Sequence, residues 1–392
     1  MSNNRTYKKL GELATFSRGL TFSKADVADV SSKKVLRSNN IDLNSHSLNY
    51  GDVACLNETF VIPDEKKLHK GDIFICMSNG STQHLGKVAF IEDDIEYAFG
   101  GFMGAIHPNV KLVYPKYVFY SCLSTEYRRY LASVLNGVNI NNLKWSELSN
   151  FSIPVPPLAT QSRIVSELDL LQSIIDKQKS QLKELDNLAQ AIFYDMFGDP
   201  VENEKGWEVK NLGDLCEVYR GGSPRPIERF LGGTIPWIKI GDATKGDDIY
   251  LHQTKEHIIE EGLKKTRYIH AGSLIFANCG VSLGFARIIT FDGCIHDGWL
   301  AFDNVSKSIE KVFLLKSLNF CTSYFRSIAP DGTQPNLNTA IMKSFKQILP
   351  PLPMQKLYIA KIESIEKQKA AISKSIEETQ KLFDYTMDKY FG

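Results

Sequence analysis

The sequence predicts an α+β protein in which two β-rich globular domains are separated by a pair of long antiparallel coiled-coil helices, with an internal two-fold pseudo-repeat. Three observations predict this fold class. Motifs recur in the same order in both halves, each half begins with short strands punctuated by glycines, and each half ends in a long stretch of helical apolar spacing. A chain of 392 residues, 43% of them hydrophobic, is long enough to give each domain its own core.

The repeat is visible in paired motifs. Leu10-Gly-Glu-Leu13 returns 202 residues later as Leu212-Gly-Asp-Leu215, and Pro156-Pro-Leu158 with Gln161 returns 194 residues later as Pro350-Pro-Leu352 with Gln355. The second copy is therefore eight residues shorter (202 − 194) through loop deletions. Because the motifs keep one order over the whole length, they indicate duplicated domains rather than a solenoid of short repeats.

These motifs divide the chain into five segments. We expect a first β-rich domain over 1–157, a first long helix over 158–198, a connector over 199–207, a second β-rich domain over 208–351 and a second long helix over 352–392. The connector begins with Asp199-Pro200, a pair that stops a helix.

Both β-rich domains show the same order of elements. Strands are expected at 72–77, 87–91 and 98–106 in the first copy, and at 273–277, 286–291 and 299–302 in the second. A short amphipathic helix should follow near 114–131, where Pro115 suits the first turn, with its counterpart near 309–327. A loop rich in Gly and Asn, a short strand and a Pro-Pro stop then lead into each long helix.

Apolar residues spaced alternately by four and three form one face of each long helix, which should span roughly 36–38 residues. The first seam comprises Ile164, Leu168, Leu171, Ile175, Gln178, Leu182, Leu185, Ala189, Ile192 and Met196. The second comprises Tyr358, Ile362, Ile365, Lys369, Ile372, Ile376, Thr379, Phe383, Thr386 and Tyr390. Since one chain supplies both stripes, we expect the helices to pair with each other. Pairing of each with a helix of another molecule is the alternative.

No motif of catalysis is present. The sequence lacks G-x-x-x-x-G-K-[ST], which would hold a nucleotide phosphate, and [DN]-P-P-[FY], which holds the target amine in amino-methyltransferases. Pro63-Asp-Glu-Lys-Lys67 has the residue types of a metal-dependent nuclease, but adjacent residues cannot converge on one ion, so we interpret it as a charged turn. The Phe99–Gly104 glycines sit within a predicted strand and open no helix. The sequence therefore predicts no catalytic residues.

The scattered cysteines and histidines predict no metal site. None of the seven cysteines forms a C-x-x-C pair, which favours free thiols in a reducing cytoplasm, and the eight histidines contain no H-x-x-x-H pair. The N-terminus has no signal-peptide pattern, and no apolar run approaches the ~20 residues of a membrane span. We therefore expect a cytoplasmic protein without membrane contact.

The remaining candidate functional residues are polar side chains in the loops of the β-rich domains, and they suit binding rather than catalysis. Their amide and hydroxyl side chains suit base edges, although such loops are also commonly just solvated turns. The net charge of +1 weighs against a chain that grips DNA alone. The candidate DNA-binding residues are Arg37, Asn39, Asn40, Ser78, Asn79, Ser81, Gln83 and His84 in the first copy, and Lys239, Asn278, Ser282, Gln334 and Asn336 in the second.

With these paired motifs, and with helix ends that read Met196-Phe-Gly-Asp-Pro200 and Lys389-Tyr-Phe-Gly392, the chain resembles the specificity subunit of type I restriction–modification systems. Gly233-Thr-Ile-Pro-Trp-Ile238 and Leu283-Gly284 are also typical of that family. Each motif is weak alone, but their duplicated order is specific, and the resemblance covers essentially the whole length.

The resemblance implies that each β-rich domain is a target recognition domain that reads one half of a split site in double-stranded DNA. The helices would form a spacer that sets the gap between the half-sites and docks two methyltransferase subunits, which bind S-adenosylmethionine and methylate adenine at N6. Two restriction and translocase subunits that use ATP and Mg would complete the complex. This chain would bind no cofactor and catalyse no reaction. The rival hypothesis is a coiled-coil adaptor that binds proteins without selective DNA readout.

Overall fold

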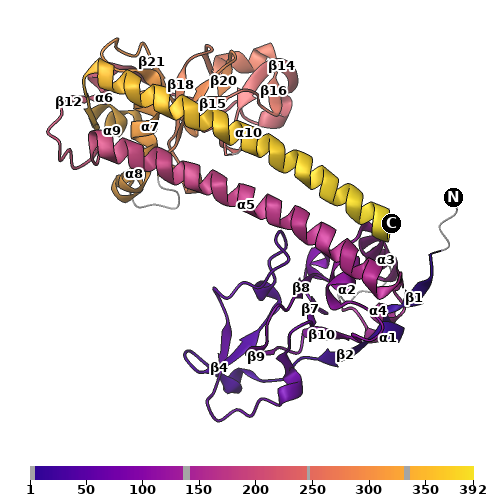
Figure 1. The fold of residues 1–392 in the computed structure, drawn as a ribbon. Coiled ribbons are helices and arrows are strands. Elements are labelled where there is room, and N and C mark those ends of the chain that lie inside the picture. The colour runs from indigo at the N-terminus through magenta and orange to yellow at the C-terminus, as the bar shows by residue number, and fades with distance from the viewer. Residues whose placement is uncertain (1–4, 136–141, 245–247, 331–335) are drawn as a thin grey trace. The chain divides into compact units, whose positions relative to one another are not determined.

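The computed structural model describes residues 5–135, 142–244, 248–330 and 336–392. Contacts within the chain divide it into two compact units, of which unit 1 comprises residues 1–177 and 376–392, and unit 2 comprises residues 178–375. Helices α5 (Leu158–Phe197) and α10 (Leu352–Phe391) are each 40 residues long, slightly longer than the spacing predicts (Figure 1). The first part of α5 and the last part of α10 belong to unit 1, and the remaining parts of both helices belong to unit 2.

Unit 1 is built around a four-stranded antiparallel sheet of order β2-β10-β7-β8. Its strands are β2 (Ala14–Arg18), β10 (Met103–Pro108), β7 (Ile73–Cys76) and β8 (Val88–Phe90). Helices α2 (Pro115–Ser121) and α3 (Thr125–Leu135) pack on one face, where Ile73 and Ile75 meet Tyr117 and Tyr127. Since successive strand residues face opposite sides, Phe74 and Cys76 of β7 pack instead against the second sheet of the unit.

That second sheet has the order β3-β5-β4-β9-β6, and a two-stranded ladder joins β1 to β11. The strands are β3 (Val27–Ala28), β5 (Ala54–Leu56), β4 (Lys33–Leu36), β9 (Ile95–Phe99), β6 (Lys67–Leu68), β1 (Tyr7–Lys9) and β11 (Ser152–Pro154). Strands β4 and β9 are parallel, because the chain passes through the first sheet between them. The unit is thus a sandwich of two sheets with helices on one outer face.

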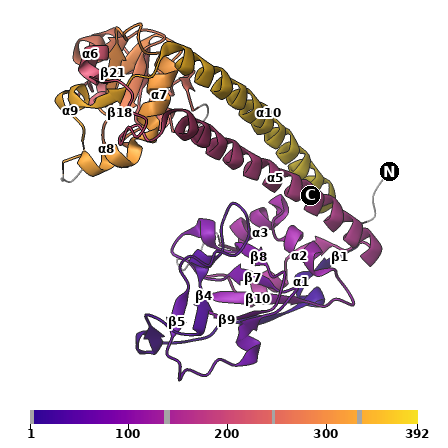
Figure 2. The same cartoon turned by 60° about the vertical axis from the view of Figure 1, so that its left-hand side comes forward.

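The strand orders show that unit 2, drawn from a second side in Figure 2, repeats this plan. The order β13-β21-β18-β19-β15 corresponds to the first sheet of unit 1, the order β16-β14-β20-β17 to its second sheet, and the ladder β12-β22 to β1-β11. The strands are β12 (Val209–Asn211), β13 (Glu217–Arg220), β14 (Leu231–Ile238), β15 (Tyr250–Leu251), β16 (Glu256–Ile258), β17 (Arg267–Ile269), β18 (Leu274–Ala277), β19 (Ala286–Ile289), β20 (Gly293–Ile295), β21 (Trp299–Asp303) and β22 (Lys346–Ile348). Strands β14 and β20 are parallel, as are β4 and β9. The internal pseudo-repeat is confirmed.

Two local predictions were wrong. The segment 98–106, expected to be one strand, contains parts of two strands that belong to different sheets. Strand β9 ends at Phe99, the chain turns over residues 100–102, and β10 begins at Met103. The expected helix near 114–131 is likewise two helices, and the same break separates α7 (Lys311–Phe320) from α8 (Thr322–Ile328) in unit 2. Glycines can sit in strands, but here they let the chain change sheet.

The paired motifs have clear structural roles. The glutamine of each Pro-Pro-Leu…Gln motif is fully buried: Gln161 accepts a hydrogen bond from the Tyr114 amide (2.8 Å), and Gln355 accepts one from the Glu310 amide (2.9 Å). Each amide group also donates to the carbonyl of the first proline, at 2.8 Å in unit 1 and 2.7 Å in unit 2. One buried side chain thus fixes the start of a long helix to the segment that enters α2 or α7.

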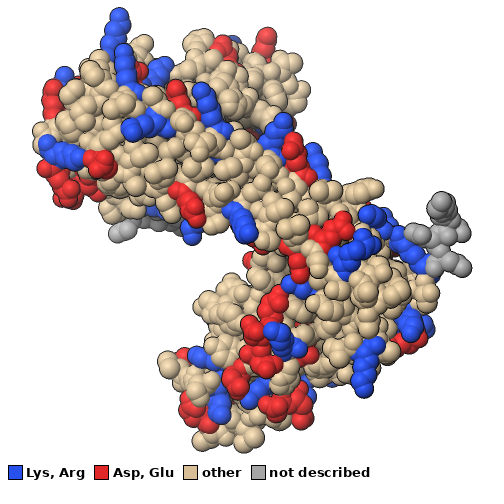
Figure 3. All heavy atoms as spheres, in the orientation of Figure 1, with Lys and Arg blue, Asp and Glu red and all other residues tan. Residues whose placement is uncertain are grey.

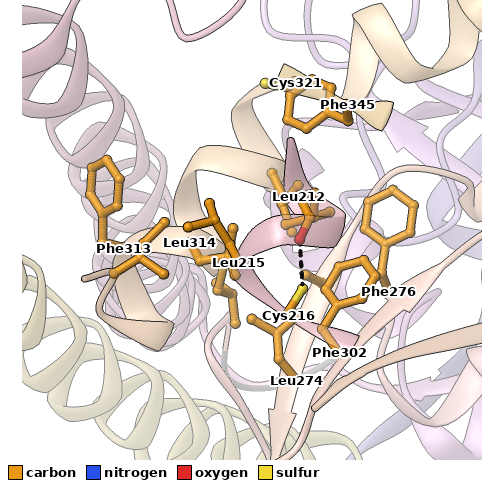
Figure 4. Packing of buried hydrophobic residues seen from close by; sticks show 14 of the residues in the cluster. Leu212, Leu215, Cys216, Leu274, Phe276, Phe302, Phe313, Leu314, Cys321 and Phe345 are labelled. Carbon is orange, nitrogen blue, oxygen red and sulfur yellow. Dashed lines mark hydrogen bonds between the residues drawn. The ribbon is translucent and has the colours of Figure 1, made fainter. Parts of the chain in front are cut away.

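The two leucines of each Leu-Gly-acidic-Leu motif form a short helix, α1 (Leu10–Leu13) or α6 (Leu212–Leu215), that delivers both leucines to the core. In unit 2, Leu212 and Leu215 pack with Leu274, Phe276 and Phe302 (Figure 4). The glycines between the leucines face α4 (Trp145–Ser149) and α9 (Thr339–Ser344), where a Cβ would lie 3.0 Å from Ser149 and from Lys343. A larger residue would therefore push these short helices apart.

The two long helices pair within this chain, as predicted. In unit 1 the first half of α5 packs against the end of α10, with Leu168 and Ile175 in one cluster with Phe383 and Phe391. In unit 2 the end of α5 packs against the start of α10, where the rings of Phe193 and Phe197 each lie 5.5 Å from that of Tyr358. Because the end of each helix packs against the first part of the other, the two helices are antiparallel.

Burial along the seam is uneven. Ten seam positions are buried, namely Ile164, Leu168, Leu171, Ile175 and Ala189 in α5 and Tyr358, Ile362, Ile365, Phe383 and Thr386 in α10. Leu182, Leu185, Ile192, Met196, Ile372, Ile376, Thr379 and Tyr390 are only half-buried. Towards the end of each helix the buried row moves by one residue, to Phe193 and Phe197 in α5 and to Met387 and Phe391 in α10. A straight α-helix drifts relative to a strict heptad, which accounts for this shift.

Polar groups fill the half-buried part of the seam in unit 2. The Gln178 amide donates to the Ser375 hydroxyl at 2.7 Å. The Lys369 ammonium lies 2.7 Å from Asp186 of α5 and 2.5 Å from Asp248 of the β-rich part. Lys369 therefore joins both helices to the body of unit 2, which explains how a lysine is tolerated at a seam position.

Candidate nucleic-acid interface

A close chain crossing defines the candidate site of unit 1. After β2 the Gly19 amide donates to the Met103 carbonyl (3.2 Å), and the Leu20 amide donates to the Phe99 carbonyl (2.6 Å). A Cβ on Gly19 would lie 2.0 Å from the Gly100 carbonyl oxygen, so only glycine fits at this crossing. The crossing holds the turn after β9 beside the loops that follow β4 and β7.

These loops surround a hollow of about 780 Å³. Four of the predicted DNA-binding residues line it, namely Arg37, Asn39, Ser78 and Asn79. Phe102, whose side chain is 73% exposed, and Asp52 also line it, and the sequence did not single out either residue. The structure thus brings together residues from four separate loops around one concave surface.

Asp52 organises the polar side of the hollow. Its carboxylate pairs with the Arg37 guanidinium at 3.2 Å and accepts a hydrogen bond from the Asn39 amide at 2.9 Å. The Asp52 carbonyl accepts two further hydrogen bonds, from Asn39 at 3.0 Å and from Asn40 at 2.9 Å. The contact could not be found from the sequence, because Asp52 is an ordinary loop acid 15 residues from Arg37.

Asn40 has a different position from Asn39. Its side chain is 1% exposed, its Oδ1 caps the turn by accepting from the Arg37 amide (2.7 Å), and its amide donates to the Asn49 carbonyl (2.8 Å). These bonds hold the 49–52 loop against the turn that carries Arg37 and Asn39. In this structure Asn40 stabilises two of the loops that form the hollow but does not itself line the hollow.

The loop after β7 is ordered by Asn79. Its amide donates to the Ser38 hydroxyl at 2.8 Å, and its Oδ1 accepts from the Ser81 amide at 2.9 Å. Ser81 and Gln83 are exposed and His84 is half-buried, and all three lie outside the lining of the hollow. The predicted residues of this loop therefore split into Ser78 and Asn79 at the hollow and the other three beyond it.

Unit 2 builds the same turn with other residues. The Lys239 amide donates to the Asp242 carboxylate (2.9 Å), as the Arg37 amide does to Asn40, and the Lys239 ammonium is paired with Glu256. Lys239 also lies 5.7 Å from the centre of the Trp237 ring, a cation–π arrangement. Both halves thus hold a basic residue against an acidic one at the start of this turn.

The other predicted residues of unit 2 are placed unevenly. Asn278 is fully buried, and its amide donates to the Asn336 Oδ1 (3.0 Å) and to the Leu337 carbonyl (3.2 Å). Ser282 and Asn336 are half-buried, while Gln334 lies outside the described residues. Asn278 and Asn336 therefore join two loops of the site to each other.

The crossing in unit 2 carries charged side chains that the sequence did not single out. Gly221 packs on the His296 carbonyl, where a Cβ would lie 2.2 Å from the oxygen. The next residue, Asp297, accepts a hydrogen bond from Ser223 (2.8 Å) and lies 3.0 Å from His296 and 3.6 Å from Arg225. Burial opposes the charge of Asp297, but the Ser223 hydrogen bond and the neighbouring cations outweigh it and lower its pKa. Burial also lowers the pKa of His296, which favours the neutral imidazole at pH 7.

The thiols and possible metal ligands of the described residues form no second candidate site. On the face drawn in Figure 3, Lys and Arg are interspersed with Asp and Glu on both units. All seven cysteines are unpaired. Within the described ranges, no three or more His, Cys, Asp or Glu side chains are grouped as a metal site would require. Among the helices that the structure describes, none has the length and apolar character needed to cross a membrane.

Comparison with known proteins gives a family and a fold. The family model of the type I restriction modification DNA specificity domain matches twice, over residues 3–187 and 204–380. The chain is 25% identical to the type I restriction enzyme EcoKI specificity subunit of Escherichia coli (strain K12), over 93% of this chain and 82% of that protein. It is 26% identical to the MjaIX specificity subunit of Methanocaldococcus jannaschii, over 71% of this chain and 68% of that protein.

Two solved structures share the fold. The crystal structure of the S subunit of a type I restriction–modification system from M. genitalium aligns with a TM-score of 0.57 at 14% identity, over 100% of this chain and 98% of that one. A chain from a structure concerned with complex assembly and conformational transition of the type I R–M system aligns with a TM-score of 0.61 at 20% identity, with the same coverage. These likenesses extend over both units and both long helices.

Proposed function

This chain belongs to the type I restriction modification DNA specificity family, and from that premise we propose that it is the subunit that selects the DNA sequence in a type I restriction–modification complex. Each β-rich part acts as a target recognition domain, and each reads one half of a bipartite site. The chain performs no chemistry itself. The alternative of a protein adaptor without selective readout is less well supported, because the family is defined by DNA specificity.

One observation carries the proposal of two different half-sites. The same turn, crossing and loop recur in both units, but the groups that they present differ: Arg37, Asn39 and Phe102 in unit 1 correspond to Lys239, Gly241 and Gly298 in unit 2. Base edges differ in their pattern of donors, acceptors and methyl groups, so different side chains on one frame select different bases. Two unequal readers in one chain suit an asymmetric site.

We assign the catalytic steps to partner subunits. S-adenosylmethionine would bind to two methyltransferase subunits, which methylate adenine at N6, and ATP and Mg would bind to two restriction and translocase subunits. A methyltransferase reaches a base only after that base leaves the stack. The role of this chain is then to place the partner over the correct adenine.

The long helices supply the spacer and the docking surface in this proposal. Leu188 of α5 and Leu382 of α10 occupy equivalent positions in the repeat, 194 residues apart, and their side chains are 47% and 51% exposed. Equivalent exposed leucines on two pseudo-symmetric helices suit two copies of one partner. In the assembled complex the partner subunits would cover these leucines, which would explain why two large apolar side chains are exposed on this chain alone.

We keep a cytoplasmic location as part of the proposal, since DNA and the partner subunits would be found there. Seven unpaired cysteines suit a reducing compartment.

The proposal is tested by expressing the chain with its methyltransferase partner and sequencing the methylated adenines of the host genome. We expect one split motif with two unequal halves. Exchange of residues 208–351 for those of a relative should change one half and leave the other half and the gap intact. Binding of the complex to all duplexes with equal affinity in a gel shift would instead favour the adaptor.

A further inference from the structure

The Asn39 side chain is fixed in one orientation by its neighbours. Its Nδ2 lies 3.0 Å from the Asp52 carbonyl and 2.9 Å from the Asp52 carboxylate. Both partners are acceptors only, so a reversed amide would place Oδ1 against two oxygens, and the nitrogen assignment follows. With the Asn39 Nδ2 already bonded to two acceptors, its Oδ1 acceptor is left for a ligand.

An acceptor at this place discriminates among the groups of DNA. Phosphate oxygens are acceptors and cannot bond to Oδ1. In the major groove guanine and thymine also present only acceptors and a methyl group, whereas adenine N6 and cytosine N4 are amino donors. Asn39 is exposed and lines the hollow of unit 1, so its oxygen is within reach of a ligand there.

Asp52 is itself held in place. The Arg37 guanidinium lies 3.2 Å from both of its carboxylate oxygens, and the buried Asn40 bonds to its carbonyl. Such a network lowers the freedom of Asn39 before any ligand arrives, which reduces the entropy lost on binding. Unit 2 has no equivalent amide, because Gly241 stands two residues after Lys239 where Asn39 stands two residues after Arg37.

We propose that Asn39 is a specificity-determining residue of unit 1, whose Oδ1 accepts a hydrogen bond from the exocyclic amino group of one adenine or cytosine in the major groove, with Asp52 as its positioning residue. This inference rests on the proposed function and deepens it. It assigns a donor-bearing base to one position of one half-site and leaves the half-site of unit 2 unconstrained.

The test uses the full chain in complex with its methyltransferase partner, on the duplex identified by methylation sequencing. Amino groups of the half-site read by unit 1 are removed one at a time, with purine in place of adenine and pyrimidin-2-one in place of cytosine. The wild-type complex should lose about tenfold in affinity at one position, the worth of one good hydrogen bond. Which analogue causes the loss distinguishes adenine from cytosine.

The variant Asn39→Ala should bind the parent duplex about tenfold more weakly and should no longer respond to the analogue at that position. Asn44→Ala changes an exposed asparagine of the same domain outside the hollow, and it should respond as the wild type does. An Asn39→Ala complex that stays as sensitive as the wild type at every position would overturn the inference. So would a loss of affinity that appears only when guanine is replaced by hypoxanthine, because that amino group lies in the minor groove.

Asp52→Ala tests the positioning role without removing Asn39. The alanine removes the carboxylate that accepts from the Asn39 amide. Discrimination between the amino-bearing base and its analogue should therefore fall several-fold while binding to the parent duplex persists. Undiminished discrimination would refute the role of Asp52. A wild-type complex without any sequence preference would contradict the proposed function itself, and so the two failures can be told apart.

Discussion

Units 1 and 2 make the same chain crossing with different side chains. In unit 1, Gly19 packs on the carbonyl of Gly100, and Gly101 and Phe102 follow; in unit 2, Gly221 packs on the carbonyl of His296, and Asp297 and Gly298 follow. The crossing requires glycine at Gly19 and Gly221, because a Cβ at either position would overlap the carbonyl oxygen of the partner segment. The partner segment is free to carry an aromatic ring in one unit and an imidazole and a carboxylate in the other, so binding chemistry can vary while the frame is kept.

The side chains that pack at the ends of the two long helices also differ between the units. Phe193 and Met387 occupy equivalent positions 194 residues apart, but Phe193 is fully buried among aromatic rings, at 4.7 Å from Phe320 and 5.5 Å from Tyr358, while Met387 is 6% exposed. At this position unit 2 therefore packs a ring against tilted and edge-on rings, whereas unit 1 packs a flexible thioether.

The largest effect should come from Phe193→Ala. Removal of a buried ring costs about 3–5 kcal/mol of unfolding free energy, whereas Met387→Ala should cost about 2 kcal/mol, since the site can partly collapse. Hydrogen exchange resolved by residue would assign each loss to its own unit. Leu188→Ala on the exposed face of α5 is the control and should change stability by less than about 0.5 kcal/mol. Equal losses from Phe193→Ala and Met387→Ala would break the contrast between the two helix ends.

The crossings themselves should be next in size, and equal in the two units. Gly19→Ala and Gly221→Ala each place a methyl group against a carbonyl, which costs about 1–3 kcal/mol by overpacking. Gly241→Ala is the matched control, because nothing lies within 4 Å of a Cβ built there. Urea denaturation monitored separately for each unit would measure these losses. If either alanine variant were as stable as the wild type, the crossing would not require glycine.

Lys369 should give the smallest and most conditional effect. Ile175 is its equivalent in α5, where the seam is apolar and fully buried. Lys369→Ile leaves Asp248 without its closest cation and should destabilise unit 2 by about 1 kcal/mol at pH 7, because solvent screens this partly exposed carboxylate. Burial opposes the charge of Asp248, but the hydrogen bond and charge of Lys369, with Lys316 and Arg287, outweigh it and lower its pKa.

The pH dependence gives the check on this prediction. Because the pKa of Asp248 is lower in the folded chain, its stabilisation is present above the unfolded value of about 3.9 and is lost as pH falls through the folded value. The difference in unfolding free energy between wild type and Lys369→Ile should therefore shrink below about pH 4. A difference that stays constant from pH 7 to pH 3 would show that packing, and not the ion pair, is the cause.

The sequence allowed the repeat, the strand positions and the long paired helices to be predicted, because each of these is written in local periodicity or in duplicated motifs. It did not allow Asn39 to be separated from Asn40, although one is exposed and the other buried, because only the tertiary fold decides which side of the turn meets the 49–52 loop. Asp52 was missed for the same reason. The break of the 98–106 segment was missed because glycines in a strand and glycines at a change of sheet look alike.

The division of the helices between the units sets an order of folding. Unit 2 is one continuous stretch, 178–375, whereas the core of unit 1 includes Phe383, Met387 and Phe391, which follow all of unit 2 in the chain. During synthesis from the N-terminus, every residue of unit 2 is therefore made before unit 1 can close its core. The first β-rich part to be synthesised is the last to be completed, and it waits with the apolar face of α5 uncovered until the end of α10 arrives.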